Sequence, residues 1–170
     1  METRHLQTPS IIGLFDRLAD GVYTLAARVL GDRHLAEDVV QETFLTALRK
    51  LGTWRGDGSI EGWIYRIGYR QSIAQLRRRR DLPADPIELL DRADSAPSPE
   101  HHVLRAELAT RIDAAIGELN STLRAAFVLR DVEGLSTGDV AAALDLSESA
   151  VKMRLNRARK SLRAKLEDYL

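Results

Sequence analysis

The chain has 170 residues, 44% of them hydrophobic, and its 25 basic and 25 acidic residues give a formal net charge of zero. This length allows one large domain or two small ones, and the absence of cysteine excludes disulfides, thiolate zinc sites and cysteine nucleophiles. The first residues lack the apolar core of a signal peptide, and no stretch approaches the roughly 20 apolar residues of a membrane span. We therefore expect a cytoplasmic protein without membrane insertion.

Apolar residues in the first third of the chain recur at helical spacing, not with the alternation of a strand. They are Leu14, Leu18, Val22, Leu25 and Val29, then Ala36, Val40, Phe44, Ala47, Leu48 and Leu51. Gly31 and Asp32 separate two predicted helices, and the loop sequence at 56–59 precedes a third over residues 60–79. Residues 1–80 are therefore predicted to form a helical bundle.

One face of the second predicted helix carries a stripe that is mainly acidic and amide in character. Its members, at i, i+3, i+4 and i+7, are Asp38, Gln41, Glu42 and Leu45. On spacing alone, solvated surface is the simplest interpretation. The same chemistry also suits a basic helical partner, where charge steers the encounter and the leucine contact sets the lifetime.

The third predicted helix interleaves aromatic residues with arginines. Residues 66–80 contain six arginines and no acid. Trp63, Tyr65 and Tyr69 lie on the same segment, and Trp54 lies just before the loop. Aromatic rings stack on unpaired bases, worth roughly 1–3 kcal/mol each, while arginines neutralise phosphates. The pattern indicates a single-strand nucleic-acid surface, with core packing an equally good interpretation of Trp54 and Trp63.

The segment at 81–102 is predicted to be a flexible acidic linker. Residues 81–100 hold six acids against the single Arg92, together with four of the five prolines. The linker separates two segments that are each locally about plus six, at 66–80 and 147–165, although the whole chain is neutral. This asymmetry indicates two anion-binding surfaces.

Residues 103–170 are predicted to form a second domain, with helices at 103–118, 121–132, 136–144 and 147–166. Ser136 and Asp139 form a capping-box pattern at the start of the third of these helices. A tight turn at 145–147 then precedes a long basic helix. This order and spacing are typical of a helix-turn-helix.

The last predicted helix has one apolar stripe and one polar face. Val151, Leu155, Ala158 and Leu162 form the stripe and are predicted to be buried. The outward residues are Ser149, Lys152, Met153, Asn156, Arg157 and Lys160. Asparagine and arginine can bond adenine and guanine edges, and lysines suit phosphates, so this face can reach a major groove. A solubilising basic helix end is the plainer alternative.

Residues 129–159, LRDVEGLSTGDVAAALDLSESAVKMRLNRAR, resemble region four of the extracytoplasmic-function sigma factors. Residues 36–48, AEDVVQETFLTAL, and 63–79, WIYRIGYRQSIAQLRRR, resemble region two of the same family. The resemblance implies an all-α fold of two small domains, the region 2 bundle and the region 4 helix-turn-helix. It also implies an alternative sigma factor, which directs bacterial RNA polymerase to promoters, supports their opening and needs no cofactor.

Residue roles follow from the resemblance. The stripe at Asp38, Gln41, Glu42 and Leu45 is expected to dock on the beta-prime clamp helices of core RNA polymerase, and the beta flap is a second polymerase contact. The residues expected at the melted minus-ten element are Trp54, Asp57, Trp63, Arg66, Tyr69, Arg70, Arg77 and Arg78. The polar face of the last helix is expected to contact the duplex minus-thirty-five element. An anti-sigma factor is a further expected partner.

Three positions depart from the family pattern. Asn120 replaces a Leu-Pro pair, but asparagine is itself a good helix cap. Asp145 replaces the customary turn glycine, where left-handed backbone geometry is expected at some cost. Arg70 replaces a frequent asparagine. These departures leave the expected fold intact and affect the promoter contacts that the resemblance implies.

Other functions have weaker support. The four histidines show no metal-ligand spacing, and the chain has no phosphate loop and no nucleophile elbow, so neither a metal site nor an enzyme is expected. A LuxR-like helix-turn-helix regulator is the main alternative, although it leaves the Asp38 stripe and the arginine-rich helix unexplained. A helical protein that only sequesters another factor is a third hypothesis.

Overall fold

The computed structural model describes residues 10–81 and 101–167, without the side chains of residues 80–81 and 101–106. Its α-helices are α1 (Ile11–Leu30), α2 (Arg33–Lys50), α3 (Ile60–Asp81), α4 (His101–Gly117), α5 (Ser121–Phe127), α6 (Thr137–Leu144) and α7 (Glu148–Leu166). A 3₁₀ turn, Leu51–Thr53, follows α2, and a π-helical turn, Val128–Val132, follows α5. The described ranges contain no strand, which confirms the all-α prediction. The predicted acidic linker lies almost wholly outside them.

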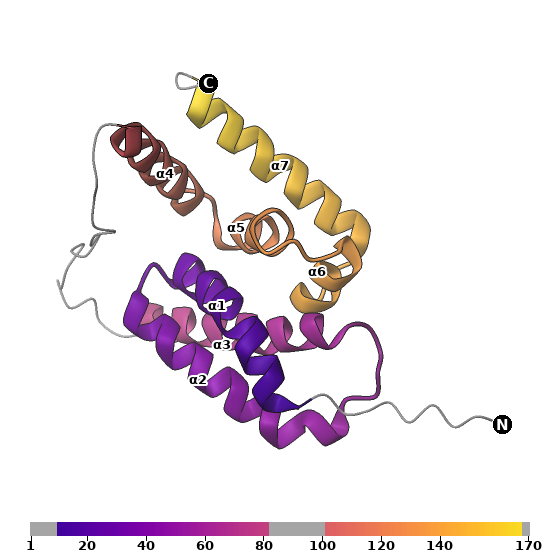
Figure 1. Cartoon of the computed structure of the whole chain (residues 1–170). Coiled ribbons are helices and arrows are strands. Elements are labelled where there is room, and N and C mark those ends of the chain that lie inside the picture. The colour runs from indigo at the N-terminus through magenta and orange to yellow at the C-terminus, as the bar shows by residue number, and fades with distance from the viewer. Residues whose placement is uncertain (1–9, 82–100, 168–170) are drawn as a thin grey trace.

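Helices α1, α2 and α3 pack together as the N-terminal bundle, the lower half of Figure 1. The predicted apolar positions of α1, from Leu14 to Val29, are all buried. Gly31 ends α1 with a left-handed φ of 65°, and the Asp32 side chain caps α2 by accepting a hydrogen bond from the Leu35 amide at 3.0 Å. Leu48 continues the apolar spacing of α2 but is 57% exposed.

Helices α4 to α7 form the C-terminal bundle, the upper half of Figure 1. Asn120 caps α5 by accepting a hydrogen bond from the Leu123 amide at 2.9 Å. The predicted stripe of α7 is buried at all four positions. The apolar spacing thus orients α7, and its opposite face is left to solvent.

The helix-turn-helix forms through the predicted cap and turn. The Ser136 hydroxyl accepts a hydrogen bond from the Asp139 amide at 3.0 Å, and the Asp139 carboxylate accepts one from that hydroxyl at 2.7 Å. Asp145 adopts φ 57° and ψ 49°, the left-handed geometry that the sequence indicates. The next amide, of Leu146, bonds the Ala141 carbonyl at 2.9 Å, so the end of α6 is satisfied as in a Schellman cap.

The two bundles are in direct contact, which sequence periodicity does not indicate. Helix α6 packs on α3, and α5 with the π-helical turn packs on α1, so one apolar core runs through both bundles. Arg124 on α5 donates to the carbonyls of Arg28 at 2.7 Å, Leu119 at 2.6 Å and Ile116 at 3.1 Å. These bonds tie the carboxyl ends of α1 and α4 together, where a cation also complements the helix dipoles.

Tyr65 marks the centre of this contact. Its hydroxyl donates to the Glu133 carboxylate at 3.1 Å. Helix α1 can lie close to this hydroxyl because residue 21 is glycine, and a Cβ there would overlap the hydroxyl. Burial, followed by the charge and hydrogen bond of Glu133, raises the pKa of Tyr65 well above its ordinary value. The phenol therefore stays protonated at neutral pH and is held as a donor.

Candidate nucleic-acid interface

The outward face of α7 is available for contacts with a duplex. All six residues predicted to contact the minus-thirty-five element are exposed: Ser149, Lys152, Met153, Asn156, Arg157 and Lys160. Five lie within three turns of one another, and Lys160 follows one turn later, so they span about 16 Å along the helix axis. A face of this length and polarity fits a major groove.

Two anchors fix α7 relative to the helices before it. The Ser147 hydroxyl caps the helix by accepting a hydrogen bond from the Ala150 amide at 3.2 Å. Arg159 donates from two nitrogens to the Asp131 carboxylate, at 2.8 and 2.6 Å. The hydrogen bond to Asp131 raises the pKa of Arg159. The bonds of Arg159 to Asp131 thus hold α7 against the preceding π-helical turn, and they fix the orientation of the neighbouring polar face.

The predicted minus-ten residues on α3 divide into covered and open groups. Trp63 and Tyr69 are half-buried, whereas Arg77 and Arg78 are exposed. Burial raises the pKa of Tyr69, and the positive charges of Arg154 and Arg77 act in the opposite direction. A shallow cavity of about 370 Å³ is lined by Tyr69, Arg70, Ile73, Ala74 and Arg77. This cavity brings part of the predicted single-strand surface together.

Arg66 and Arg70 lie one turn apart on α3 and face the C-terminal bundle. Both form ion pairs with Asp145, at 2.5 Å from Arg66 and 2.7 Å from Arg70. Their guanidinium groups therefore hold a protein carboxylate in this arrangement. Tyr65, which the sequence groups with the stacking aromatics, is 3% exposed and bonded to Glu133, so its ring packs in the core.

The loop before α3 carries the remaining two predicted residues. Trp54 is half-buried, and its indole N–H is buried without a hydrogen-bond partner among the described atoms. Asp57 is exposed between Gly56 and Gly58, whose φ values of 79° and 80° favour glycine. Arg77 lies 14 residues beyond Trp63, about 21 Å along α3. The predicted set thus follows the length of α3 and is not one compact pocket.

The four predicted polymerase-binding residues, Asp38, Gln41, Glu42 and Leu45, are all exposed on α2. Glu42 also pairs with Arg49 at 2.8 Å, one of several surface contacts along this helix. Leu45 is 52% exposed, so an apolar group lies among acidic and amide groups as the sequence indicates.

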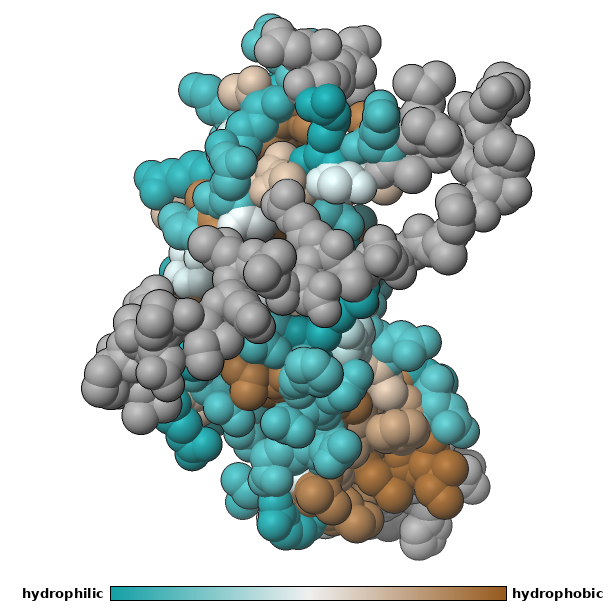
Figure 2. Space-filling model, turned by 90° about the vertical axis from the view of Figure 1, so that its left-hand side faces the viewer, coloured by the Kyte–Doolittle hydropathy of each residue, from teal (hydrophilic) through white to brown (hydrophobic). Residues whose placement is uncertain are grey.

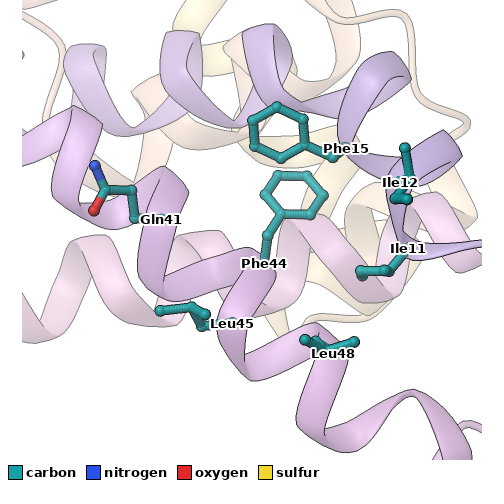
Figure 3. A pocket seen from close by; sticks show the side chains of 7 residues that line it. All are labelled: Ile11, Ile12, Phe15, Gln41, Phe44, Leu45 and Leu48. Atoms are coloured by element: carbon teal, nitrogen blue, oxygen red, sulfur yellow. The ribbon is translucent and has the colours of Figure 1, made fainter.

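An apolar hollow of about 430 Å³ lies between α1 and α2, beside this stripe (Figure 3). Its lining residues are Ile11, Ile12, Phe15, Gln41, Phe44, Leu45 and Leu48. The rings of Phe15 and Phe44 meet edge to face, 4.9 Å apart. Figure 2 shows hydrophobic side chains gathered at the lower right of that view, on the N-terminal bundle. Ile12 and Phe15 were not among the predicted surface residues, although their i, i+3 spacing marks a second apolar stripe on α1.

Two further findings bear on the class of site. Among the described residues, no three His, Asp or Glu side chains lie close enough to hold a metal ion. Within the same ranges, no helix is long and apolar enough to cross a membrane.

Comparisons with known proteins identify the family of the chain. Residues 14–81 match the family model of Sigma-70 region 2, and residues 109–162 match that of Sigma-70, region 4. The chain is 35% identical over 156 residues to the RNA polymerase sigma-H factor of Pseudomonas aeruginosa. This match covers 86% of this chain and 80% of that protein. The chain belongs to the extracytoplasmic-function sigma factors of the sigma-70 family.

Other similar proteins are consistent with that family. This sigma factor is 37% identical over 164 residues to the ECF RNA polymerase sigma factor SigE of Mycolicibacterium smegmatis; the match covers 95% of this chain but only 62% of that protein. The structure of CnrH in complex with the cytosolic domain of CnrY is similar at 30% identity and a TM-score of 0.67, over 94% of this chain and 89% of that one.

A further solved structure, RpoE in complex with the anti-sigma factor NepR from Bartonella quintana, shares the fold at 20% identity and a TM-score of 0.71, over 94% of this chain and 98% of that one. The region 2 match covers α2 and the arginine-rich α3, the part of the chain that the LuxR-like alternative leaves unexplained.

Proposed function

We propose that this sigma factor is an alternative initiation factor that directs bacterial RNA polymerase to its own set of promoters and has no catalytic activity itself. The observation that carries the proposal is the exposed polar face of α7, braced by Arg159 and Asp131, on a chain that also exposes the α2 stripe. A duplex-reading helix and a protein-docking helix in one chain fit a factor that brings an enzyme to DNA.

The division of work follows the chain. Residues 1–80 bind the polymerase clamp helices and the melted minus-ten strand, and residues 103–170 read the minus-thirty-five element and contact the beta flap. The acidic linker at 81–102 crosses polymerase between them, and its charge suits a basic channel that otherwise holds RNA. We place this activity in the cytoplasm, where the polymerase and promoters are.

An anti-sigma factor is part of the proposal. Two similar structures are complexes, of CnrH with the cytosolic domain of CnrY and of RpoE with the anti-sigma factor NepR. We infer that a comparable partner covers the α2 stripe or the α3 surface of this chain and so keeps it from polymerase.

Replacing Asp38 with arginine tests the polymerase surface. The variant is expected to bind core RNA polymerase at least about tenfold more weakly, because a positive charge would replace a negative one opposite a basic partner. Binding is measured by titrating labelled full-length protein with core enzyme at fixed salt. Glu107→Arg, the same charge change at an exposed position of α4, is the matched control and should bind like the parent. Equal affinity of Asp38→Arg and the parent would remove the clamp assignment.

Duplex binding separates this proposal from a purely sequestering protein. Holoenzyme containing this chain should bind promoter DNA with an affinity that falls steeply as salt rises, because phosphate contacts release counterions. If the chain only sequestered another factor, core enzyme would bind promoter and unrelated duplexes equally well in its presence.

A further inference from the structure

Asp145 joins the two bundles at the predicted DNA surface. One carboxylate oxygen accepts from the Arg66 guanidinium at 2.5 Å and the other from the Arg70 guanidinium at 2.7 Å. Asp145 is 79 positions from Arg66 and 75 from Arg70 in the chain, yet its carboxylate spans these two arginines on successive turns of α3. We call this set of contacts the Asp145 clasp.

The backbone conformation of Asp145 favours glycine, so the carboxylate found there needs a reason other than the turn itself. Among the described residues, Asp145 is the one non-glycine residue with a positive φ, and glycine adopts this geometry at lower cost. A carboxylate is therefore kept at a turn that favours a residue without a side chain. Arg70 and Asp145 are also two of the three positions that depart from the family pattern, and here they bind each other.

Other acids of the C-terminal bundle meet the same helix. The Asp139 carboxylate accepts a hydrogen bond from the Ser59 hydroxyl, just before α3, and Glu133 accepts one from Tyr65. Gly62 allows the approach, since a Cβ there would lie 3.2 Å from a carboxylate oxygen of Asp139. Three carboxylates thus follow the amino-terminal half of α3, and at the clasp a carboxylate takes the guanidinium donors that would otherwise bind phosphate.

We propose that the Asp145 clasp holds the C-terminal bundle over α3 and competes with single-stranded DNA for Arg66 and Arg70, so that the closed arrangement and minus-ten binding exclude each other. This inference rests on the proposed function, because it assumes that α3 binds DNA. The pairs are partly exposed, with side-chain exposures of 37% for Arg66, 62% for Arg70 and 54% for Asp145. Each such pair shifts an equilibrium by about 1.4- to 5-fold, so the two pairs together bias the closed arrangement, which the apolar contact between the bundles also favours.

The clasp is tested first by the distance between the bundles. The chain has no cysteine, so His34→Cys on α2 and Ala164→Cys on α7, both exposed positions, accept two dyes for single-molecule energy transfer on the full chain. Asp145→Asn and Asp145→Gly both suit the left-handed turn and lack the charge. Each is expected to raise the ratio of open to closed molecules by about 2- to 30-fold relative to the parent. Unchanged distance distributions in both variants would overturn the clasp.

A matched control and a competing ligand complete the test. Glu61→Gln breaks the ion pair to Arg17 within the N-terminal bundle and should leave the distance distribution unchanged. Adding a single-stranded thymidine oligonucleotide should open the parent, and Asp145→Asn should bind it more tightly by the same factor as its open fraction rises. Tight binding of the oligonucleotide to a parent that stays closed would contradict the competition. If the oligonucleotide binds neither protein, the α3 assignment fails, while the distance measurement still decides the clasp.

Discussion

Leu129→Ala is expected to lower the free energy of unfolding by about 2–5 kcal/mol, because it removes a leucine side chain that is 0% exposed. Leu129 lies in the π-helical turn Val128–Val132, which packs against α1, α5 and α6. The cavity therefore opens where the two bundles share their core. Urea unfolding followed by helical circular dichroism gives the change, from the shift of the midpoint at constant slope.

Leu48→Ala is the control for that experiment. The same atoms are removed from a helix, but Leu48 is 57% exposed, so a change within about 0.5 kcal/mol is expected. Since one apolar core runs through both bundles, the parent should unfold in a single transition. Two well-separated transitions, or equal effects of the two substitutions, would contradict the packing described above.

Arg157→Ala is expected to weaken promoter binding at one upstream base pair by about 1–3 kcal/mol, because an exposed arginine on the outward face of α7 can bond a guanine edge bidentately. The measurement compares holoenzyme affinity for a parent promoter and for duplexes with single substitutions in the minus-thirty-five element. Discrimination at one position should disappear in the variant. A uniform loss across unrelated sequences would contradict the readout role.

Arg78→Ala provides the contrasting case in the same assay. Arg78 is exposed near the end of α3, where the sequence places a phosphate contact. Its loss should weaken all sequences about equally and reduce the slope of log affinity against log salt by about 1. Arg157→Ala and Arg78→Ala thus separate sequence readout from backbone contact at the same change of charge.

The sequence predicted what depends on local spacing. Asn120 and Ser136 were predicted as helix caps, and each accepts a backbone hydrogen bond in the structure. Asp32 and Ser147, which the sequence places at helix boundaries, turn out to be caps as well. The buried stripe of α7 follows from the helical period. The left-handed turn at Asp145 also follows, because the end of α6 needs one residue with positive φ there.

The contact between the bundles could not be predicted from the local spacing of residues. Tyr65 sits among aromatic and basic residues in the sequence, and only the approach of Gly21 and Glu133 shows that its ring is buried. Arg66 and Arg70 likewise form ion pairs with Asp145, which follows the acidic segment in the chain. Helical periodicity identifies a face that will be covered or used, but it does not say which distant element meets it.

The exposure of several apolar residues was also not predicted from the sequence. Leu48 has the spacing of a core residue, yet it lines the hollow with Ile12 and Phe15. A second apolar stripe beside the core stripe has the same period, so the sequence alone does not distinguish a wider core from an open docking surface.

Run-off transcription with core bacterial RNA polymerase shows whether this chain starts transcription at specific promoters. Core enzyme is incubated with and without this chain on fragments of the genome that encodes it, and the transcripts are sequenced from their starts. New, discrete starts that appear only with the chain, and that are lost with Asp38→Arg, are the predicted result. An unchanged transcript pattern on all fragments, with no binding of the chain to core enzyme, would contradict the assignment as an initiation factor.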